Sequence, residues 1–149
     1  MSITDIIATI ALVVSVINLS MFIYLTIQAN KSSKIQALTA QGAFESQIRS
    51  MISDATKEMN SYAVQIGREP ENEILHRAYY TAEEMYRNAY EDACAKYIDG
   101  KIDKERFKKL YHIEVQKLVE DPNQEEFYSG VQSPYTCTVK VYREWCRQV

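Results

Sequence analysis

The first thirty residues form an almost uninterrupted apolar run. Residues 6–27 contain no charged side chain and consist mainly of Ile, Val and Leu. At about 1.5 Å per residue, a helix of this length matches the hydrocarbon core of a bilayer. A cleaved signal peptide and a buried core helix are the alternatives, but the run is long for either and no Lys or Arg precedes it. The pattern predicts a transmembrane helix over residues 1–29.

One stripe of this predicted span differs from the rest of its surface. Its members recur at steps of three and four residues: Ala8, Ala11, Ser15, Asn18 and Phe22. Small side chains let helices approach closely, and an asparagine in hydrocarbon needs a hydrogen-bond partner on another helix. The stripe therefore predicts a homo-oligomer within the membrane. The alternative is a monomeric anchor that tolerates one polar residue. In an oligomer, a ring of Asn18 side chains would form the polar point of a pore.

Residues 30–67 continue the helical pattern without a proline. Their apolar positions repeat at steps of four and three: Ile48, Ile52, Ala55, Met59, Tyr62 and Ile66. This spacing predicts an amphipathic juxtamembrane stalk helix that continues the span and ends at Gly67.

Two further helices are expected after this stalk. Pro70 suits a first helical position, and Gly100 suits the end of the helix that it starts. The apolar side of that helix is predicted to contain Leu75, Ala78, Ala82, Met85, Ala89 and Ala93. Asp103 is a good N-cap for the next helix, which Asp121 and Pro122 end. The apolar stripe predicted there comprises Phe107, Leu110, Tyr111, Val115 and Leu118.

The C-terminal segment is harder to assign. Residues 123–132 are typical of a loop or a broken turn, with Phe127 and Tyr128 packed against the helices. Residues 136–141 have strand propensity, but apolar side chains from Tyr135 to Cys146 recur at helical spacing, which favours a final helix. The predicted fold is all-α: a transmembrane helix that continues into a cytoplasmic bundle of about four helices. Residues 68–149 form the cytoplasmic helical domain in this division.

Charge distribution sets the expected orientation in the membrane. Asp5 precedes the span, whereas Lys31 and Lys34 follow it at once. The positive-inside tendency then places the N-terminus outside and the C-terminal domain in the cytoplasm, at the inner membrane. Three widely spaced cysteines fit a reducing compartment. A net charge of −3 argues against a protein that coats duplex nucleic acid.

Catalytic signatures are absent from the sequence. It contains no glycine-rich phosphate loop, no Gly-x-Ser-x-Gly elbow and no His-Glu-x-x-His pair. His76 and His112 are far apart, and Cys94 is interpreted as a small packing residue. We therefore expect neither an enzyme nor a metal or cofactor site.

Two compositional features remain: charge segregation and an excess of tyrosine. Residues 69–95 carry seven acids and two bases, whereas residues 96–117 carry seven bases and four acids. A tyrosine ring can stack on a nucleobase while Arg or Lys binds phosphate. The alternatives are paired helix surfaces for the charges, contact with anionic lipid headgroups, and helix or subunit interfaces for the eleven tyrosines. The candidate ligand-binding residues are Arg77, Tyr79, Tyr80, Lys101, Lys104, Arg106, Lys108, Lys109, Tyr111 and His112.

Several short segments resemble a group of small bacterial proteins with one N-terminal span and a helical cytoplasmic domain. They are Tyr-Ile-Asp-Gly-Lys-Ile-Asp-Lys at 97–104, Leu-Tyr at 110–111, Ser-Pro-Tyr at 133–135 and Lys-Val-Tyr-Arg-Glu-Trp at 140–145. The layout is similar to the membrane-anchored effectors of type III CRISPR antiviral defence that bind cyclic oligoadenylate.

The resemblance implies a non-enzymatic effector whose cytoplasmic domain binds a cyclic oligonucleotide such as cyclic tetra-adenylate. A ring with four-fold or three-fold symmetry would match a cyclic homo-oligomer of the same order, a tetramer or a trimer. Ligand binding would then perturb the membrane or open a pore. The alternative is a membrane anchor whose helical domain docks a partner protein.

Overall fold

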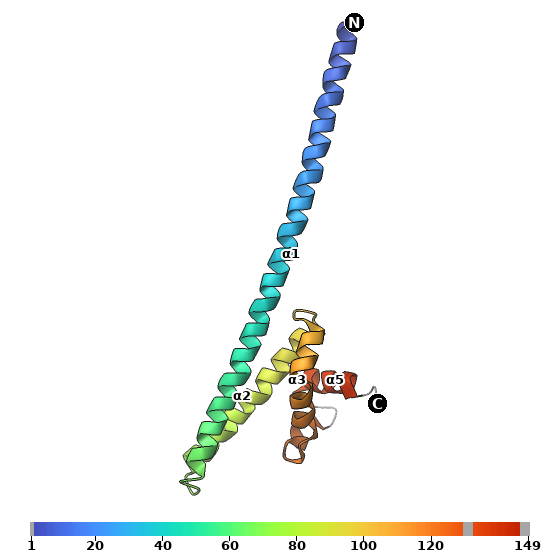
Figure 1. Cartoon of the computed structure of the whole chain (residues 1–149). Coiled ribbons are helices and arrows are strands. Elements are labelled where there is room, and N and C mark those ends of the chain that lie inside the picture. The colour runs from blue at the N-terminus through green and yellow to red at the C-terminus, as the bar shows by residue number, and fades with distance from the viewer. Residues whose placement is uncertain (1, 130–132, 147–149) are drawn as a thin grey trace. The chain divides into compact units, whose positions relative to one another are not determined.

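The protein is helical throughout the part that the structure describes. This computed structural model describes residues 2–129 and 133–146, apart from the side chains of Asp5 and Ala8. The elements are α1 (Ile3–Ile66), α2 (Glu73–Ile98), α3 (Lys104–Glu120), the 3₁₀ turn η1 (Pro122–Gln124), the single-turn α4 (Glu125–Tyr128) and α5 (Thr136–Cys146) (Figure 1). No strand occurs in these ranges, so the predicted all-α fold and the helical assignment of residues 136–146 are confirmed.

The chain divides into two units, Met1–Ala40 and Gln41–Val149. The first unit is the N-terminal part of α1, and its large apolar side chains are exposed, Phe22 at 68% for example. An 18-residue window of α1 has a mean hydropathy of 2.3 and none of it is buried. This helix is therefore long and apolar enough to cross a membrane.

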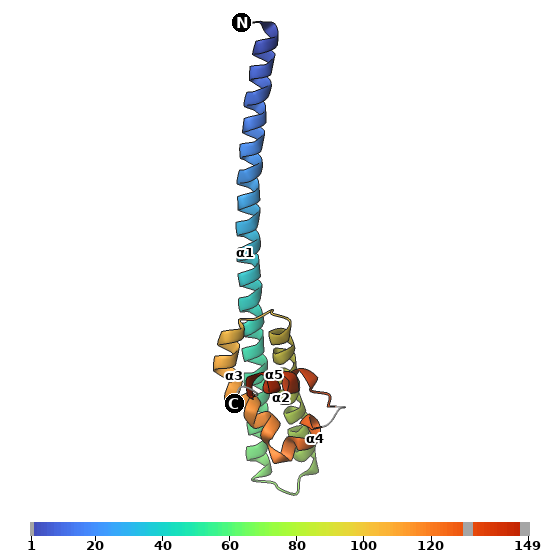
Figure 2. The same cartoon turned by 90° about the vertical axis from the view of Figure 1, so that its right-hand side faces the viewer.

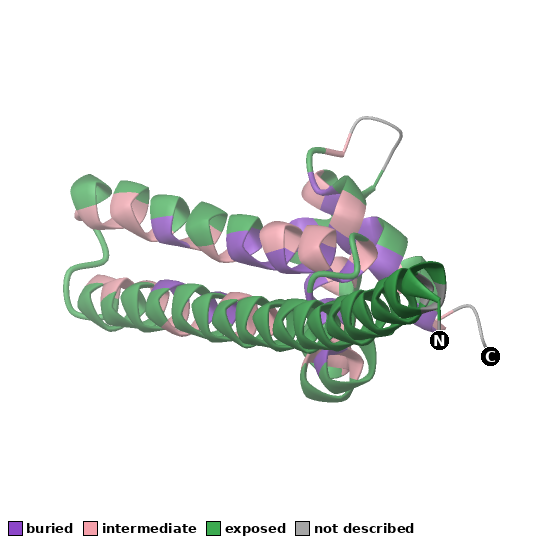
Figure 3. Ribbon diagram, turned by 90° about the horizontal axis from the view of Figure 1, so that it is seen from above, coloured by how far each residue is buried: buried purple, intermediate pink, exposed green. Residues whose placement is uncertain are grey.

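In the second unit, residues 41–66 of α1 lie beside α2 (Figures 1 and 3). The predicted apolar stripe is confirmed here, because Ile48, Ile52 and Ala55 are buried and Met59, Tyr62 and Ile66 are half-buried. Figure 3 shows the buried and half-buried positions of the two helices on the sides that face each other. The C-terminal part of the expected stalk is thus one wall of the helical domain.

Local capping explains most helix ends. Gly100 adopts φ +68°, and the N–H groups of Gly100 and Lys101 bond back to Tyr97 and Lys96, the pattern that ends a helix on a left-handed glycine. The Asp103 carboxylate accepts the N–H of Arg106 at 2.9 Å and caps α3 as predicted. The prediction for Pro70 was wrong. The helix begins at Glu73 because the side-chain oxygen of Asn72 accepts the N–H groups of Ile74 and Leu75. Asparagine is a favoured N-cap residue, whereas a helix that started at Pro70 would have Glu69 in that position.

The core of the second unit lies where α5 packs against α2 and α3 (Figure 2). Four tyrosines are buried in it, so they serve helix packing within one chain: Tyr90, Tyr97, Tyr128 and Tyr135. The expectation that Phe127 and Tyr128 pack against the helices is also confirmed.

Two predicted core positions were wrong. Met85 is 48% exposed and Leu110 is 49% exposed. At about 100° per residue, the buried face of α2 passes through Ala82 and Ala89 and turns Met85 outward. Leu110 is likewise turned away from the buried face of α3, to which Phe107 belongs. Met85 and Leu110 therefore lie at the edges of the buried faces of their helices.

Polar side chains fasten the short C-terminal elements to α2. The buried Arg87 donates to Gln124 at 2.9 Å and to the hydroxyl of Tyr135 at 3.3 Å, and it pairs with Glu83 at 3.5 Å. Its guanidinium also stacks over Phe127, 3.9 Å from the ring centre. This cluster fixes η1 and α4 against the middle of α2.

A second set of contacts joins the C-terminal half of α2 to α5. The indole N–H of Trp145 donates to the Tyr97 hydroxyl at 3.1 Å, and that hydroxyl donates to Glu144 at 2.7 Å. By contrast, the buried hydroxyl of Tyr128 has no hydrogen-bond partner among the described residues. Burial raises the pKa of Tyr128, so its phenol stays neutral.

Candidate functional site

The candidate ligand residues on α2 border an acidic pocket. Tyr79 and Tyr80 contact each other edge to face, with ring centres 6.1 Å apart. The pocket beside them has a volume of about 500 Å³, and its charged lining comprises Glu83, Glu84, Arg87 and Glu126. Three carboxylates against one arginine give this pocket a negative balance, which disfavours a phosphate-bearing ligand.

The two arginines of α2, Arg77 and Arg87, already form ion pairs within the chain. Arg87 is buried and held by Glu83, Gln124 and Tyr135. Arg77 pairs with Glu73 at 3.4 Å on the exposed side of α2. Neither guanidinium is available for a ligand without breaking an existing contact.

Most candidate residues near α3 are dispersed over its surface. Lys101 pairs with Asp99 at 3.0 Å, and the Lys104 ammonium lies 4.9 Å from the ring centre of Tyr97. Lys109 is exposed and Lys108 is half-buried. The His112 ring packs 5.9 Å from Trp145, so this histidine lies against the core.

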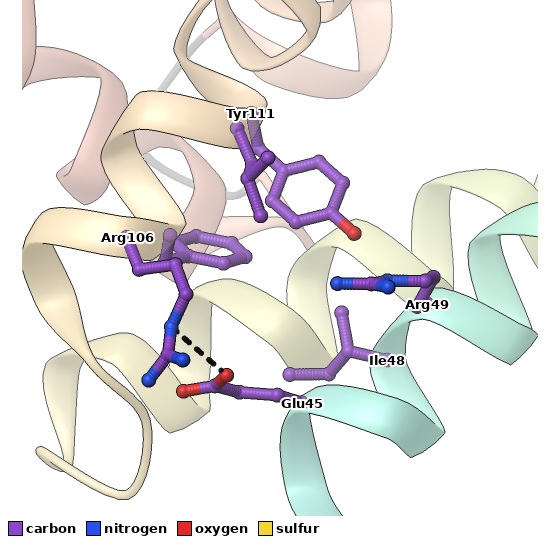
Figure 4. Close-up of a pocket in the computed structure, with 7 residues that line it drawn as sticks. Glu45, Ile48, Arg49, Arg106 and Tyr111 are labelled. Atoms are coloured by element: carbon purple, nitrogen blue, oxygen red, sulfur yellow. Dashed lines mark ion pairs between the residues drawn. The ribbon is translucent and has the colours of Figure 1, made fainter. Parts of the chain in front are cut away.

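Arg106 and Tyr111 form the exception, because they line one cavity where α3 faces α1 (Figure 4). The cavity has a volume of about 20 Å³, and its lining comprises Glu45, Ile48, Arg49, Arg106, Phe107, Leu110 and Tyr111. Arg106 pairs with Glu45 at 3.2 Å, and the other Glu45 oxygen accepts the N–H of Asp103 at 3.1 Å. The Glu45 carboxylate therefore joins α1 to the start of α3.

Sequence reasoning missed Glu45 and Arg49. Both flank Ile48, the start of the apolar stripe of α1, but nothing in the sequence indicates that this part of α1 faces α3. The structure thus divides the candidate residues between two pockets, with Tyr79 and Tyr80 at one and Arg106 and Tyr111 at the other.

Two of the groups with potential for catalysis, Cys94 and His76, are respectively buried and hydrogen-bonded. Burial raises the pKa of the Cys94 thiol to about 12, which disfavours a reactive thiolate. The Nε2 atom of His76 lies 2.8 Å from the carbonyl oxygen of Pro70. Among the described residues, no group of three or more His, Cys, Asp or Glu side chains is arranged to hold a metal ion.

The predicted membrane stripe has one polar group without a partner. The hydroxyls of Ser15, Ser20 and Thr26 donate to backbone carbonyls of their own helix, at 2.8 to 2.9 Å. Asn18 makes no such bond within the described part of the chain, and its amide is exposed on α1. Ala11 and Phe22 are exposed on the same helix, and the side chain of Ala8 lies outside the described residues.

Comparison with known proteins adds no relative. No protein family, no curated protein and no solved structure matches this chain. Functional conclusions therefore rest on the residues themselves.

Proposed function

We propose that this chain is a single-span protein of the bacterial inner membrane, with residues 41–149 as its cytoplasmic domain. The observation that supports the proposal is α1, whose described apolar side chains between residues 6 and 27 are exposed all around the helix. Exposed Ile, Val and Leu are unfavourable in water and favourable in lipid, where a helix satisfies its own backbone hydrogen bonds. Lys31 and Lys34 directly follow this stretch and favour a cytoplasmic domain.

Reporter fusions test this topology. Green fluorescent protein placed after residue 149 should fluoresce, because it folds in the cytoplasm, and alkaline phosphatase at the same place should be inactive. The protein should stay in the membrane fraction after a carbonate wash. Active phosphatase, or release by carbonate, would contradict the proposal.

We further propose that the protein is a non-enzymatic effector of anti-phage defence. Its domain binds a nucleotide second messenger of the cyclic oligoadenylate type, and the oligomeric span then perturbs the membrane or opens a pore. Two observations support this proposal. Arg106 and Tyr111 combine a guanidinium and an aromatic ring at one cavity, and Asn18 offers an unpaired amide for contact between spans.

Calorimetric titration tests the ligand. The full chain in lipid nanodiscs should bind cyclic tetra-adenylate saturably, with one ring for each oligomer, and linear tetra-adenylate should bind more weakly. Liposomes containing the protein should release a trapped dye when the cyclic ligand is added. Failure to bind cyclic oligoadenylates of any ring size would refute this function.

A second candidate function is a membrane anchor that docks a partner protein. It is favoured by a groove between α1 and α2 that is lined by Met51, Asp54, Ala55, Met85, Asn88 and Ala89. Met51 and Met85 are partly exposed, and methionine adapts readily to an apolar partner surface. Under this hypothesis Met85→Glu abolishes capture of one dominant partner while leaving membrane insertion intact. Equal capture by both forms would contradict it.

A further inference from the structure

The cavity between α1 and α3 has an apolar floor and a basic rim. Ile48 is 2% exposed and Phe107 is 4% exposed, so both belong to the core beneath the cavity. Above them lie two guanidinium groups, Arg49 from α1 and Arg106 from α3, on opposite sides of the cavity in Figure 4.

The two arginines at this rim differ in their partners. Arg106 pairs with Glu45 at 3.2 Å and with Asp103 at 3.5 Å, and Glu45 also accepts the backbone N–H of Asp103. Arg49 has no hydrogen bond or ion pair within the described ranges, so its guanidinium is free to bind an anion at the cavity.

The Tyr111 hydroxyl is a second hydrogen-bond donor at this cavity without a partner among the described residues. The Tyr111 ring packs against Phe107 and Tyr90, with centres 5.0 and 6.2 Å apart. Its hydroxyl makes no hydrogen bond to any described residue and is directed to the side of the cavity where the Arg49 guanidinium lies (Figure 4). The ring contacts fix the position of this hydroxyl, so it is held at the cavity before a ligand arrives.

We propose that this cavity binds a phosphate group, with Arg49 and the Tyr111 hydroxyl as its donors. A volume of about 20 Å³ admits one oxygen-sized group, so a phosphate oxygen enters while the rest of the ligand stays outside, over Leu110. The forked guanidinium of Arg49 suits two phosphate oxygens at once. A tetrahedral anion also offers a further oxygen to the Tyr111 hydroxyl, which a planar two-oxygen carboxylate does not.

The phosphate can be carried by a soluble nucleotide or by a phospholipid headgroup, since both present the same oxygens. The inference rests on the proposed function for this class of ligand. It assigns two residues, Arg49 and Glu45, that the sequence-based candidates do not include, and gives Tyr111 the role of a hydrogen-bond donor.

Titration of the full chain in dodecyl maltoside micelles, which contain no phosphate, tests the site, with inorganic phosphate and adenosine monophosphate as probes. Arg49→Gln should weaken binding at least about tenfold, and Tyr111→Phe should weaken it about threefold. Arg68→Gln is the matched control, because it removes the same charge from an exposed turn; it should bind as the unchanged protein does. Circular dichroism verifies that each variant folds. Equal affinity of Arg49→Gln and the control, or no binding of either probe by the unchanged protein in these micelles, overturns the proposal.

Added phospholipid separates the possible carriers. In phosphate-free micelles the site is open to soluble probes in either case. If headgroups occupy it, phosphatidylglycerol added to the micelles should lower the apparent affinity for adenosine monophosphate in the unchanged protein but not in Arg49→Gln. If the affinity is unchanged by phosphatidylglycerol, the carrier is soluble. Binding of adenosine monophosphate without any response to cyclic oligoadenylate supports this site and refutes the proposed function, whereas cyclic oligoadenylate binding that Arg49→Gln leaves intact does the reverse.

Discussion

The carboxylate of Glu91 on α2 accepts two hydrogen bonds from Thr138, from its backbone N–H at 2.9 Å and from its hydroxyl at 2.8 Å. It also accepts the backbone N–H of Cys137 at 2.8 Å. A negative charge is therefore held at the positive end of α5 by a residue of another helix. This carboxylate caps the start of α5 and joins it to α2.

Replacement of this capping carboxylate should destabilise the domain. We expect Glu91→Ala to lower the free energy of unfolding by about 2 kcal/mol, because three donors lose their acceptor. Urea unfolding of the full chain in detergent can be followed by the fluorescence of Trp145, the single tryptophan, which is buried. Glu84→Ala removes an exposed carboxylate of the same helix and should cost less than about 0.5 kcal/mol. Equal losses in the two variants would show that Glu91 has no capping role.

Loss of Arg87 should be more damaging than loss of any exposed arginine. Arg87→Met leaves the partly buried Glu83 carboxylate without its cation, and we expect a loss of about 3 kcal/mol. The double variant with Glu83→Gln should recover part of it. Arg77→Met breaks a pair in which both side chains are more than four-fifths exposed, and should cost less than about 0.5 kcal/mol. The same urea titration distinguishes these outcomes, and a small effect of Arg87→Met would argue against the buried network.

Two glycines should respond to alanine in opposite directions. Gly100 adopts φ +68°, where a Cβ atom is strained, so Gly100→Ala should destabilise the domain by about 1 kcal/mol. Gly42 lies within α1, and a Cβ atom added to it would meet nothing within 4 Å, so Gly42→Ala should stabilise its helix by up to about 1 kcal/mol. Thermal melts of both variants in the same detergent provide the comparison. A stabilising Gly100→Ala would mean that the left-handed turn after α2 does not form.

Stability should fall at alkaline pH, and Cys94 should contribute. Burial raises the pKa of this thiol from 9.0 to about 12, so the folded state holds its proton more tightly than the unfolded state. The stabilisation is fully present below pH 9 and is lost as the pH rises toward 12. We expect the fall in unfolding free energy between about pH 9 and pH 11 to be smaller in Cys94→Ala. Identical pH profiles for the two proteins would contradict this assignment.

The amide of Asn18 should strengthen contacts between spans. Asn18→Leu is expected to weaken self-association by about 1 kcal/mol per contact, measured by sedimentation in detergent. Ser20→Ala is the control, because the Ser20 hydroxyl is already bonded to the carbonyl of Val16. Unfolding of the helical domain should be unaffected by either change. If Asn18→Leu associates as strongly as the unchanged protein, the polar residue serves another purpose.

The fold could be predicted from the sequence where the signals are local. Helical spacing indicated the continuous α1 and the final helix, and Gly100 and Asp103 marked real helix ends. The start of α2 was misplaced because Pro70 and Asn72 both suit a helix start, and only the side-chain bonds of Asn72 decide between them.

The site could be predicted only in part. Arg106 and Tyr111 could be chosen as candidates from the sequence because they lie close together on one helix. Arg49 could not, because it lines the same cavity from another helix. Pairings of this kind depend on tertiary packing, as does the acidic surrounding of Tyr79 and Tyr80. The net charge of one helix does not indicate which residues of the neighbouring helices it contacts.

The contacts between α2 and α5 have a consequence for biosynthesis. Arg87 meets Tyr135, Glu91 meets Thr138 and Tyr97 meets Trp145 at sequence separations of 47 or 48 residues. During translation α2 therefore leaves the ribosome well before the segment that covers its apolar face, while the tyrosines and alanines of that face are still open to water. Closing so long a loop is entropically unfavourable until α3 has formed between the two helices. A nascent chain of this protein should thus need protection from aggregation through much of the synthesis of its domain.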